Sequence, residues 1–99
     1  MADMLRRDGY EVVEAPDGAI VLLLAFAAPV DVLLIDLRLP YLDAFEVLER
    51  LHSKKIAPRV IVMTGDLSYD VELHAKRFGV RLLTKPFTYD ELLQEIRKL

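Results

Sequence analysis

The stretch Val32–Asp36 (VLLID) decides the fold, because an uninterrupted apolar run that ends in a carboxylate is typical of a strand covered on both faces. The pattern recurs in Val60–Thr64 (VIVMT) and in Val80–Lys85 (VRLLTK), where Leu83 is the last apolar residue. Segments with helical spacing separate the three runs. This alternation predicts an α/β fold built on a parallel sheet.

Two further segments complete the predicted elements. Tyr10–Glu14 alternates briefly and stops at Pro16-Asp17-Gly18, which predicts a short strand followed by a helix that Asp17 caps. Thr88 and Glu91 have the spacing of a capping box for a last helix. We therefore expect four strands and four helices in β-α order, with all strands parallel, within a single domain over residues 1–99.

Composition excludes several classes of protein. The 99 residues are 54% apolar and 29% charged and contain no Cys, which excludes a disulfide scaffold and thiolate metal sites. Lys plus Arg number 13 against 16 for Asp plus Glu, so direct binding to nucleic acid is not expected. The longest apolar run, Ala19–Ala28, has ten residues against about 18 for a spanning helix, and no export signal is apparent. A cytoplasmic location without membrane contact is expected.

Three polar residues follow the predicted buried strands. Asp36, Thr64 and Lys85 offer a nucleophilic carboxylate, a hydroxyl and a cation. Because ligands bind outside the carboxyl ends of parallel strands, these groups are expected to converge there. A carboxylate can accept a phosphoryl group, and a cation and a hydroxyl offset the charge on its oxygens. The trio therefore indicates phosphoryl chemistry, whereas any one strand-end Asp is more often a cap or loop residue.

With these motifs in this order, the chain resembles the receiver domain of two-component response regulators, a flavodoxin-like fold. The resemblance extends over residues 9–99. The motifs that carry it are Gly9–Ala15 followed by Asp17-Gly18, Leu34–Pro40, Val60–Gly65 and Leu83–Phe87.

The resemblance implies a function and roles for particular residues. Asp36 is the implied phosphoacceptor, served by a histidine kinase or phosphotransfer protein, in a signalling domain that is not an enzyme and has no small-molecule substrate. Thr64 is the implied switch hydroxyl, Lys85 pairs with the phosphoryl group, and the bond before Pro86 is cis. Mg²⁺ is implied as a cofactor, bound by Asp36, by the backbone carbonyl of Arg38 and by an acidic pair that ends the first strand.

The beginning of the chain departs from this pattern. Residues 1–8 resemble only a remnant of the first helix, so the usual first strand and its acidic pair are missing. Mg²⁺ binding is expected to be weakened, because two carboxylate ligands are lost. The neighbouring strands are left with unpaired backbone groups, and part of the Leu92, Ile96 and Leu99 face is expected to be exposed. A shortened chain, a rearranged sheet and a homodimer that covers the gap all remain as explanations.

The helix after Gly18 also departs from the pattern. Ile20, Leu23 and Phe26 stand where solvent-facing charges are expected, so its outer face is a candidate contact surface or simply an apolar surface helix. With the missing acidic pair, this motivates an alternative function, a degenerate receiver that binds partners or itself without phosphorylation. His52 and His74 have no partner at metal-ligand spacing and are expected to be surface histidines or histidines satisfied by local contacts.

Overall fold

The computed structural model describes all residues from 1 to 99. It contains three strands and five helices, in the order α1 (Ala2–Arg7), α2 (Gly18–Ala27), β1 (Val32–Asp36), α3 (Ala44–Ser53), β2 (Arg59–Thr64), α4 (Tyr69–Phe78), β3 (Arg81–Thr84) and α5 (Tyr89–Arg97). The strands form one parallel sheet in the order β1-β2-β3, in which Val32 pairs with Arg59 and Thr64 with Thr84. The α/β class and the parallel arrangement predicted from the sequence are confirmed.

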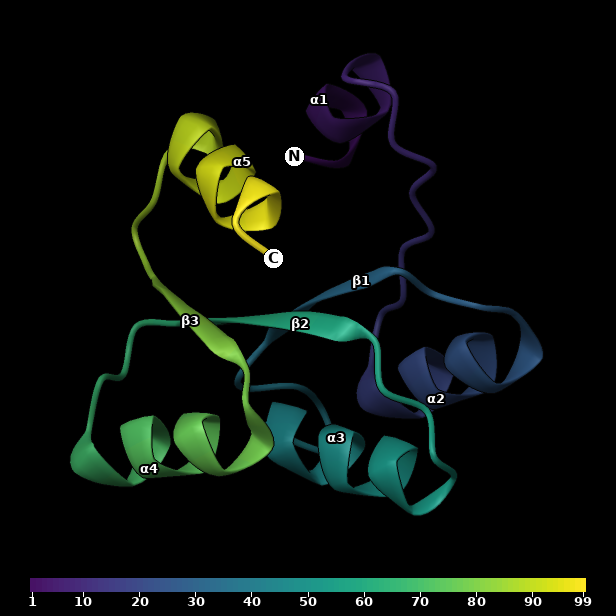
Figure 1. The fold of residues 1–99 in the computed structure, drawn as a ribbon, viewed down its shortest axis with the longest axis vertical. Coiled ribbons are helices and arrows are strands. Elements are labelled where there is room, and N and C mark those ends of the chain that lie inside the picture. Colours follow the sequence, from purple (N-terminus) through teal and green to yellow (C-terminus); the bar gives the residue numbers. More distant parts are fainter.

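The sheet forms the middle of three layers. Figure 1 shows α1 and α5 above the sheet and α2, α3 and α4 below it. Two apolar clusters fill the spaces between the layers. The larger one joins β1 and β2 to the lower helices through residues such as Leu48 and Val62, and the smaller one joins Ile61 and Leu83 to α1 and α5. Apolar side chains therefore cover both faces of the sheet, as the continuous apolar runs predict.

The prediction of four strands and four helices is wrong in two places. Residues Tyr10–Glu14 form no strand, because no other strand lies beside them to complete a hydrogen-bonded ladder. Residues Ala2–Arg7 form a fifth helix, where the sequence indicated only the remnant of one. The alternating pattern of Tyr10–Glu14 indicates which side chains face the interior. It does not indicate whether a partner strand lies beside the segment.

The helix boundaries follow the local signals. The Asp17 side chain accepts a hydrogen bond from the Ile20 amide at the start of α2, and Thr88 and Glu91 form the capping box of α5. Gly79 ends α4 in the left-handed conformation, with φ of 67°, which glycine adopts without steric cost. The predicted Asp17 cap and the predicted capping box are confirmed.

The inner face of α5 is covered, contrary to expectation. Leu92 is fully buried and Ile96 is 9% exposed, because Leu5 of α1 packs into the same cluster. Only Leu99 stays half-buried. The short α1 therefore covers part of the inner face of α5.

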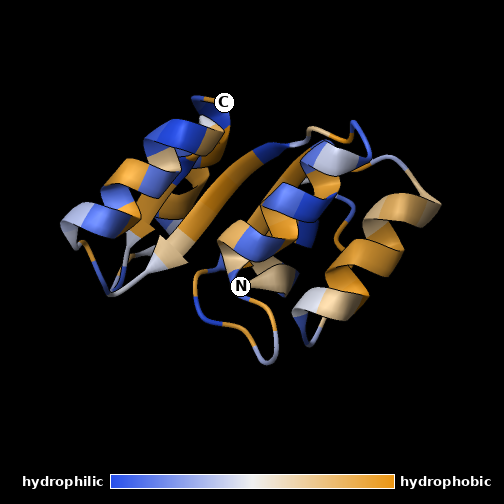
Figure 2. Ribbon diagram, turned by 90° about the horizontal axis from the view of Figure 1, so that it is seen from below, coloured by the Kyte–Doolittle hydropathy of each residue, from blue (hydrophilic) through white to orange (hydrophobic).

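Helix α2 is apolar on its outer side as well as its inner side. Val21, Leu22 and Ala25 face the core, while Leu23 is 63% and Phe26 46% exposed. In Figure 2, α2 at the right is almost entirely orange, whereas the helices beside it carry blue segments. Two of the three residues predicted to face outward, Leu23 and Phe26, are thus exposed, and the third, Ile20, is half-buried. No helix combines the length and the apolar character needed to cross a membrane.

Candidate functional site

Asp36 and Lys85 meet at the carboxyl edge of the sheet. Asp36 is the last residue of β1, and Lys85 directly follows β3, so the two residues come from the strands on either side of β2. The Lys85 ammonium donates a hydrogen bond to Oδ2 of Asp36 and forms an ion pair with it. No hydrogen bond engages Oδ1. Both side chains remain more than one third exposed, at 36% for Asp36 and 44% for Lys85, so a donor can reach the carboxylate.

Backbone hydrogen bonds carry the sheet beyond the strand ends and position these side chains. The Leu37 amide donates to the Met63 carbonyl at 2.9 Å, and the Lys85 amide donates to the Thr64 carbonyl at 2.8 Å. The Lys85-Pro86 peptide bond is cis, as the resemblance implies. The chain thus leaves β1 and β3 along fixed paths on either side of Thr64.

Thr64 ends β2 and is 3% exposed. Its hydroxyl accepts a hydrogen bond from the Asp66 amide at 2.8 Å and donates to the Asp66 carbonyl at 3.1 Å. The hydroxyl is therefore used in a local turn and makes no hydrogen bond to Asp36 or Lys85. The structure brings the carboxylate and the ammonium into contact, and it leaves the hydroxyl nearby with a different partner.

Asp66 is the residue that the sequence analysis missed. Its Oδ1 accepts from the Ser68 amide at 2.8 Å, and its Oδ2 lies 3.4 Å from Nη2 of Arg38 in an exposed ion pair. The Asp-Leu-Ser sequence just before α4 is a turn signal that could have predicted the first contact. The ion pair links the loops after β1 and β2, the two loops that flank Asp36.

The residues of this chain do not by themselves fit a magnesium site. No group of three or more His, Cys, Asp or Glu side chains is arranged to hold a metal ion. Asp36 supplies the only carboxylate among the expected ligands, and Lys85 already neutralises it. Because Mg²⁺ requires nearly octahedral oxygen ligation, one paired carboxylate and one backbone carbonyl are a poor ligand set.

Two hydrogen-bonded pairs with shifted acidity lie away from the strand ends. The Tyr89 hydroxyl donates to the Asp8 carboxylate, and this bond, with burial and the charge of Asp8, raises the pKa of Tyr89 to about 12. Arg81 donates to Glu95 at 2.7 Å and lowers the pKa of that carboxyl, with a smaller effect from Lys98. The first pair ties α5 to the end of α1, and the second ties α5 to β3.

The histidines belong to an aromatic stack between α3 and α4. His74 lies 5.2 Å from Phe45, and His52 lies 5.4 Å from Phe78, measured between ring centroids. Phe45 and Phe78 are themselves stacked at 5.8 Å. Both histidines are therefore exposed residues whose rings pack against aromatic neighbours.

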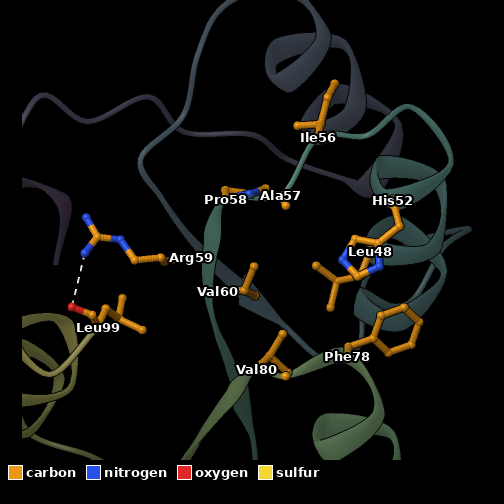
Figure 3. Close-up of a pocket in the computed structure, with 11 residues that line it drawn as sticks. Leu48, His52, Ile56, Ala57, Pro58, Arg59, Val60, Phe78, Val80 and Leu99 are labelled. Atoms are coloured by element: carbon orange, nitrogen blue, oxygen red, sulfur yellow. Dashed lines mark hydrogen bonds between the residues drawn. The ribbon is translucent and has the colours of Figure 1, made fainter.

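A small cavity lies at the opposite end of the sheet from Asp36. It has a volume of about 220 Å³ and is lined mainly by apolar side chains, among them Leu48, Val60, Phe78 and Val80. Figure 3 shows these side chains together with the hydrogen bond from Arg59 to the Leu99 carbonyl. Since Arg59 begins β2, the cavity faces the amino ends of the strands and is separate from the Asp36 site.

Comparisons with known proteins agree with this geometry. The response regulator receiver domain family matches residues 1–97. The transcriptional regulatory protein PdtaR of Mycobacterium tuberculosis is 35% identical over 98 residues, which are 97% of this chain and 47% of that protein. Sporulation initiation phosphotransferase F of Bacillus subtilis is 28% identical over 97 residues, which cover 78% of its length. This chain thus spans about half of PdtaR and a larger share of the phosphotransferase.

Solved structures show the same fold. A response regulator receiver domain protein from Methanospirillum hungatei superposes with a TM-score of 0.90 at 26% identity over 98% of this chain and 78% of that chain. The receiver domain of the sensor histidine kinase PA1611 from Pseudomonas aeruginosa, solved with a magnesium ion in its active-site cleft, gives 0.85 at 26% identity over 98% of this chain and 82% of that chain. On the family match and these likenesses, the chain belongs to the receiver domains of two-component response regulators.

Proposed function

We propose that the chain accepts a phosphoryl group on Asp36 from a histidine kinase or phosphotransfer protein and signals through a changed protein-contact surface. The observation that carries the proposal is the contact between Lys85 and Oδ2 of Asp36, which leaves Oδ1 without a hydrogen bond. A partly exposed carboxylate beside a cation is suited to attack phosphorus and to hold the charge that follows.

The proposed reaction moves a phosphoryl group from a nitrogen or oxygen atom of the donor to an oxygen atom of Asp36. Oδ1 of Asp36 forms the new bond to phosphorus, and the bond from phosphorus to the donor breaks, leaving its electron pair on the donor. The product is an acyl phosphate, whose added negative charge the Lys85 ammonium offsets at short range. Receiver domains are signalling domains. The phosphorylated chain is itself the signal, and no small-molecule product is released by this chain for its own sake.

Thr64 is proposed to convert the modification into a change of shape. In the present structure its hydroxyl is held by the backbone of Asp66. A phosphoryl group on Asp36 would add acceptor oxygens close to the end of β2, for which the same hydroxyl can donate. If the hydroxyl leaves the Asp66 turn, the loop between β2 and α4 loses two hydrogen bonds. The equilibrium between two conformations with different contact surfaces then shifts.

Magnesium is proposed to bind only weakly to these residues. The Asp36 carboxylate and the Arg38 backbone carbonyl are the two ligands that the chain offers, and Lys85 competes for the first. The alternative of a phosphorylation-independent binding module is not favoured by the comparisons, since the matched relatives are transcriptional regulators and a phosphotransferase.

The test is the intact mass of the folded chain after incubation with acetyl phosphate and Mg²⁺. One labile phosphoryl adduct is expected on the native chain and none on Asp36→Asn, which keeps the size of the side chain and removes the nucleophilic oxygen. Circular dichroism confirms that both proteins are folded. A folded native chain without an adduct would contradict the proposal and support the binding module.

A further inference from the structure

A polar groove runs between α3 and α4 on the lower side of the sheet, where Figure 1 shows the two helices side by side. Its volume is about 730 Å³, within the range of about 300–1,000 Å³ that is typical of ligand sites. Each helix contributes one face, because the lining residues recur at three- and four-residue steps, as Phe45, Glu49 and His52 do on α3. At one end the groove reaches Asp66. The α3–α4 groove therefore starts at a loop that flanks Asp36 and continues along both helices.

Aromatic rings form part of the lining of this groove. Phe45 of α3 stacks on His74 and Phe78 of α4, with ring centroids 5.2 and 5.8 Å apart. His52 contacts Phe78 in turn, at 5.4 Å. All four rings line the groove, and the two phenylalanines are only half-buried. The groove therefore offers aromatic surface to an occupant, and such surface attracts cations, above all the planar guanidinium of arginine.

The same groove is acidic. Five carboxylates line it against two guanidinium groups. The side chains of Asp43, Glu46 and Asp66 already accept hydrogen bonds from backbone amides. Those of Glu49 on α3 and Asp70 on α4 form neither a hydrogen bond nor an ion pair, and both are exposed. Each helix therefore contributes one free carboxylate beside the aromatic rings.

We propose that the α3–α4 groove binds an arginine-bearing segment of a partner protein, with guanidinium against the rings of Phe45 and Phe78 and with Glu49 and Asp70 as acceptors. Guanidinium combines a planar face with five N–H donors, so it matches both the rings and the carboxylates. The volume of about 730 Å³ also accommodates residues on either side of the arginine. The inference does not depend on phosphorylation of Asp36.

An inorganic cation and a second copy of the chain fit the groove less well. No three His, Asp or Glu side chains are arranged to hold a metal ion, and a metal ion would leave the aromatic surface uncovered. A second copy carries the same net charge of −3, so electrostatic repulsion opposes the approach of two chains. A cationic segment that also covers the aromatic rings is the better occupant.

The test is an NMR titration with a capped peptide of about six residues, enough to span a ten-residue helix in extended form. The peptide carries two arginines among alanine and serine. It is expected to shift the ring signals of Phe45, His74 and Phe78. The same peptide with citrulline in place of arginine keeps the shape and loses the charge, and it is expected to bind at least about tenfold more weakly.

Variants of the protein locate the contact. Glu49→Gln and Asp70→Asn together keep the side-chain sizes and are expected to raise the Kd of the arginine peptide by at least about threefold. Glu72→Gln is the matched control, because it removes a carboxylate of α4 that does not line the groove, and it is expected to leave the Kd unchanged. Phe45→Leu keeps an apolar side chain, removes the ring and is expected to weaken binding. The charge variants keep the test decisive if Phe45→Leu unfolds.

Several outcomes would overturn the proposal. One is the absence of shifts in the ring signals at about 5 mM arginine peptide. Another is equal affinity for the citrulline peptide or for a matched lysine peptide, since guanidinium would then not be recognised. Equal affinity for free arginine would assign the groove to a small molecule instead of a protein segment. An equal loss of affinity in Glu72→Gln would show only a general attraction to an acidic protein.

Discussion

Lys85 donates a hydrogen bond to Asp36 across the end of β2, so that side chains join the two outer strands of the sheet. This contact has a chemical consequence rather than a large structural one. An ion pair with 44% and 36% of its side chains exposed contributes at most about 1 kcal/mol to stability, whereas the same cation beside a phosphoryl group stabilises charge where it develops.

Lys85→Ala is therefore expected to slow the appearance of the phosphoryl adduct by at least about tenfold while the melting temperature changes little. Mass spectrometry over time, with acetyl phosphate as donor, measures the rate. Lys98→Ala is the matched control, because that lysine contacts only Glu95 on α5. An unchanged rate in Lys85→Ala would show that the ammonium does not serve the transfer.

Thr64→Ala is expected to lower the free energy of unfolding by about 1–2 kcal/mol, because the partly buried Asp66 amide loses its acceptor. Thr64→Ser keeps the hydroxyl and is expected to lose less. Urea denaturation measures both. The adduct on Asp36 is expected to form in all three proteins, while the change in amide spectra of the β2–α4 loop on phosphorylation is expected to be lost only in Thr64→Ala.

Two glycines provide a matched comparison of packing. A Cβ at Gly18 would lie 2.9 Å from the Leu42 Cβ, whereas a Cβ at Gly65 would meet nothing within 4 Å. Gly18→Ala is expected to destabilise the fold by about 1–3 kcal/mol through overpacking, and Gly65→Ala by much less. Thermal unfolding of the two variants checks the difference. Equal losses would mean that the loop of Leu42 moves aside.

The Arg81–Glu95 pair predicts a dependence of stability on acid. Because the pKa of Glu95 is lowered in the folded state, its contribution is present above the ordinary value of 4.5 and is lost as the pH falls through the folded value. Glu95→Gln is expected to be less stable than the native chain by up to about 1 kcal/mol near neutral pH and equally stable near pH 2. Denaturation curves at both pH values measure this difference, and a constant difference would contradict the assignment.

The Tyr89–Asp8 pair predicts the opposite dependence, in alkali. The pKa of Tyr89 is about 12 in the folded state and 10.0 in the absence of the fold, so its contribution is complete below pH 10.0 and is lost as the pH rises toward 12. The tyrosinate absorbance of the native chain is expected to contain a late component near pH 12 that is absent from Tyr89→Phe. Its presence in the variant would assign that component to another tyrosine.

The sheet could be predicted from the sequence where the pattern is local. The runs that begin at Val32, Val60 and Val80 became strands, because continuous branched apolar residues are favoured between two covering layers. The strand predicted at Tyr10–Glu14 did not form, because pairing depends on a neighbour elsewhere in the chain. The α1 helix over residues 2–7 also depends on distant packing, through Leu5.

The candidate site shows the same division. The contact between Asp36 and Lys85 could be predicted because the carboxyl ends of parallel strands lie along one edge. The ion pair of Arg38 with Asp66 could not, because it depends on the paths of two loops. The hydrogen bonds between the Thr64 hydroxyl and the Asp66 backbone likewise depend on the geometry of a turn. The proposed role of Thr64 concerns the phosphorylated protein.

Helix α1 has only six residues, and a segment of that length is not helical on its own in water. Its helical form therefore depends on the contact of Leu5 with α5 and on the bond between Asp8 and Tyr89. A spectroscopic probe placed at the exposed Met4 would consequently measure whether the contact between α1 and α5 is intact. Any change that separates α5 from α1 would therefore be visible as the unfolding of the short helix α1.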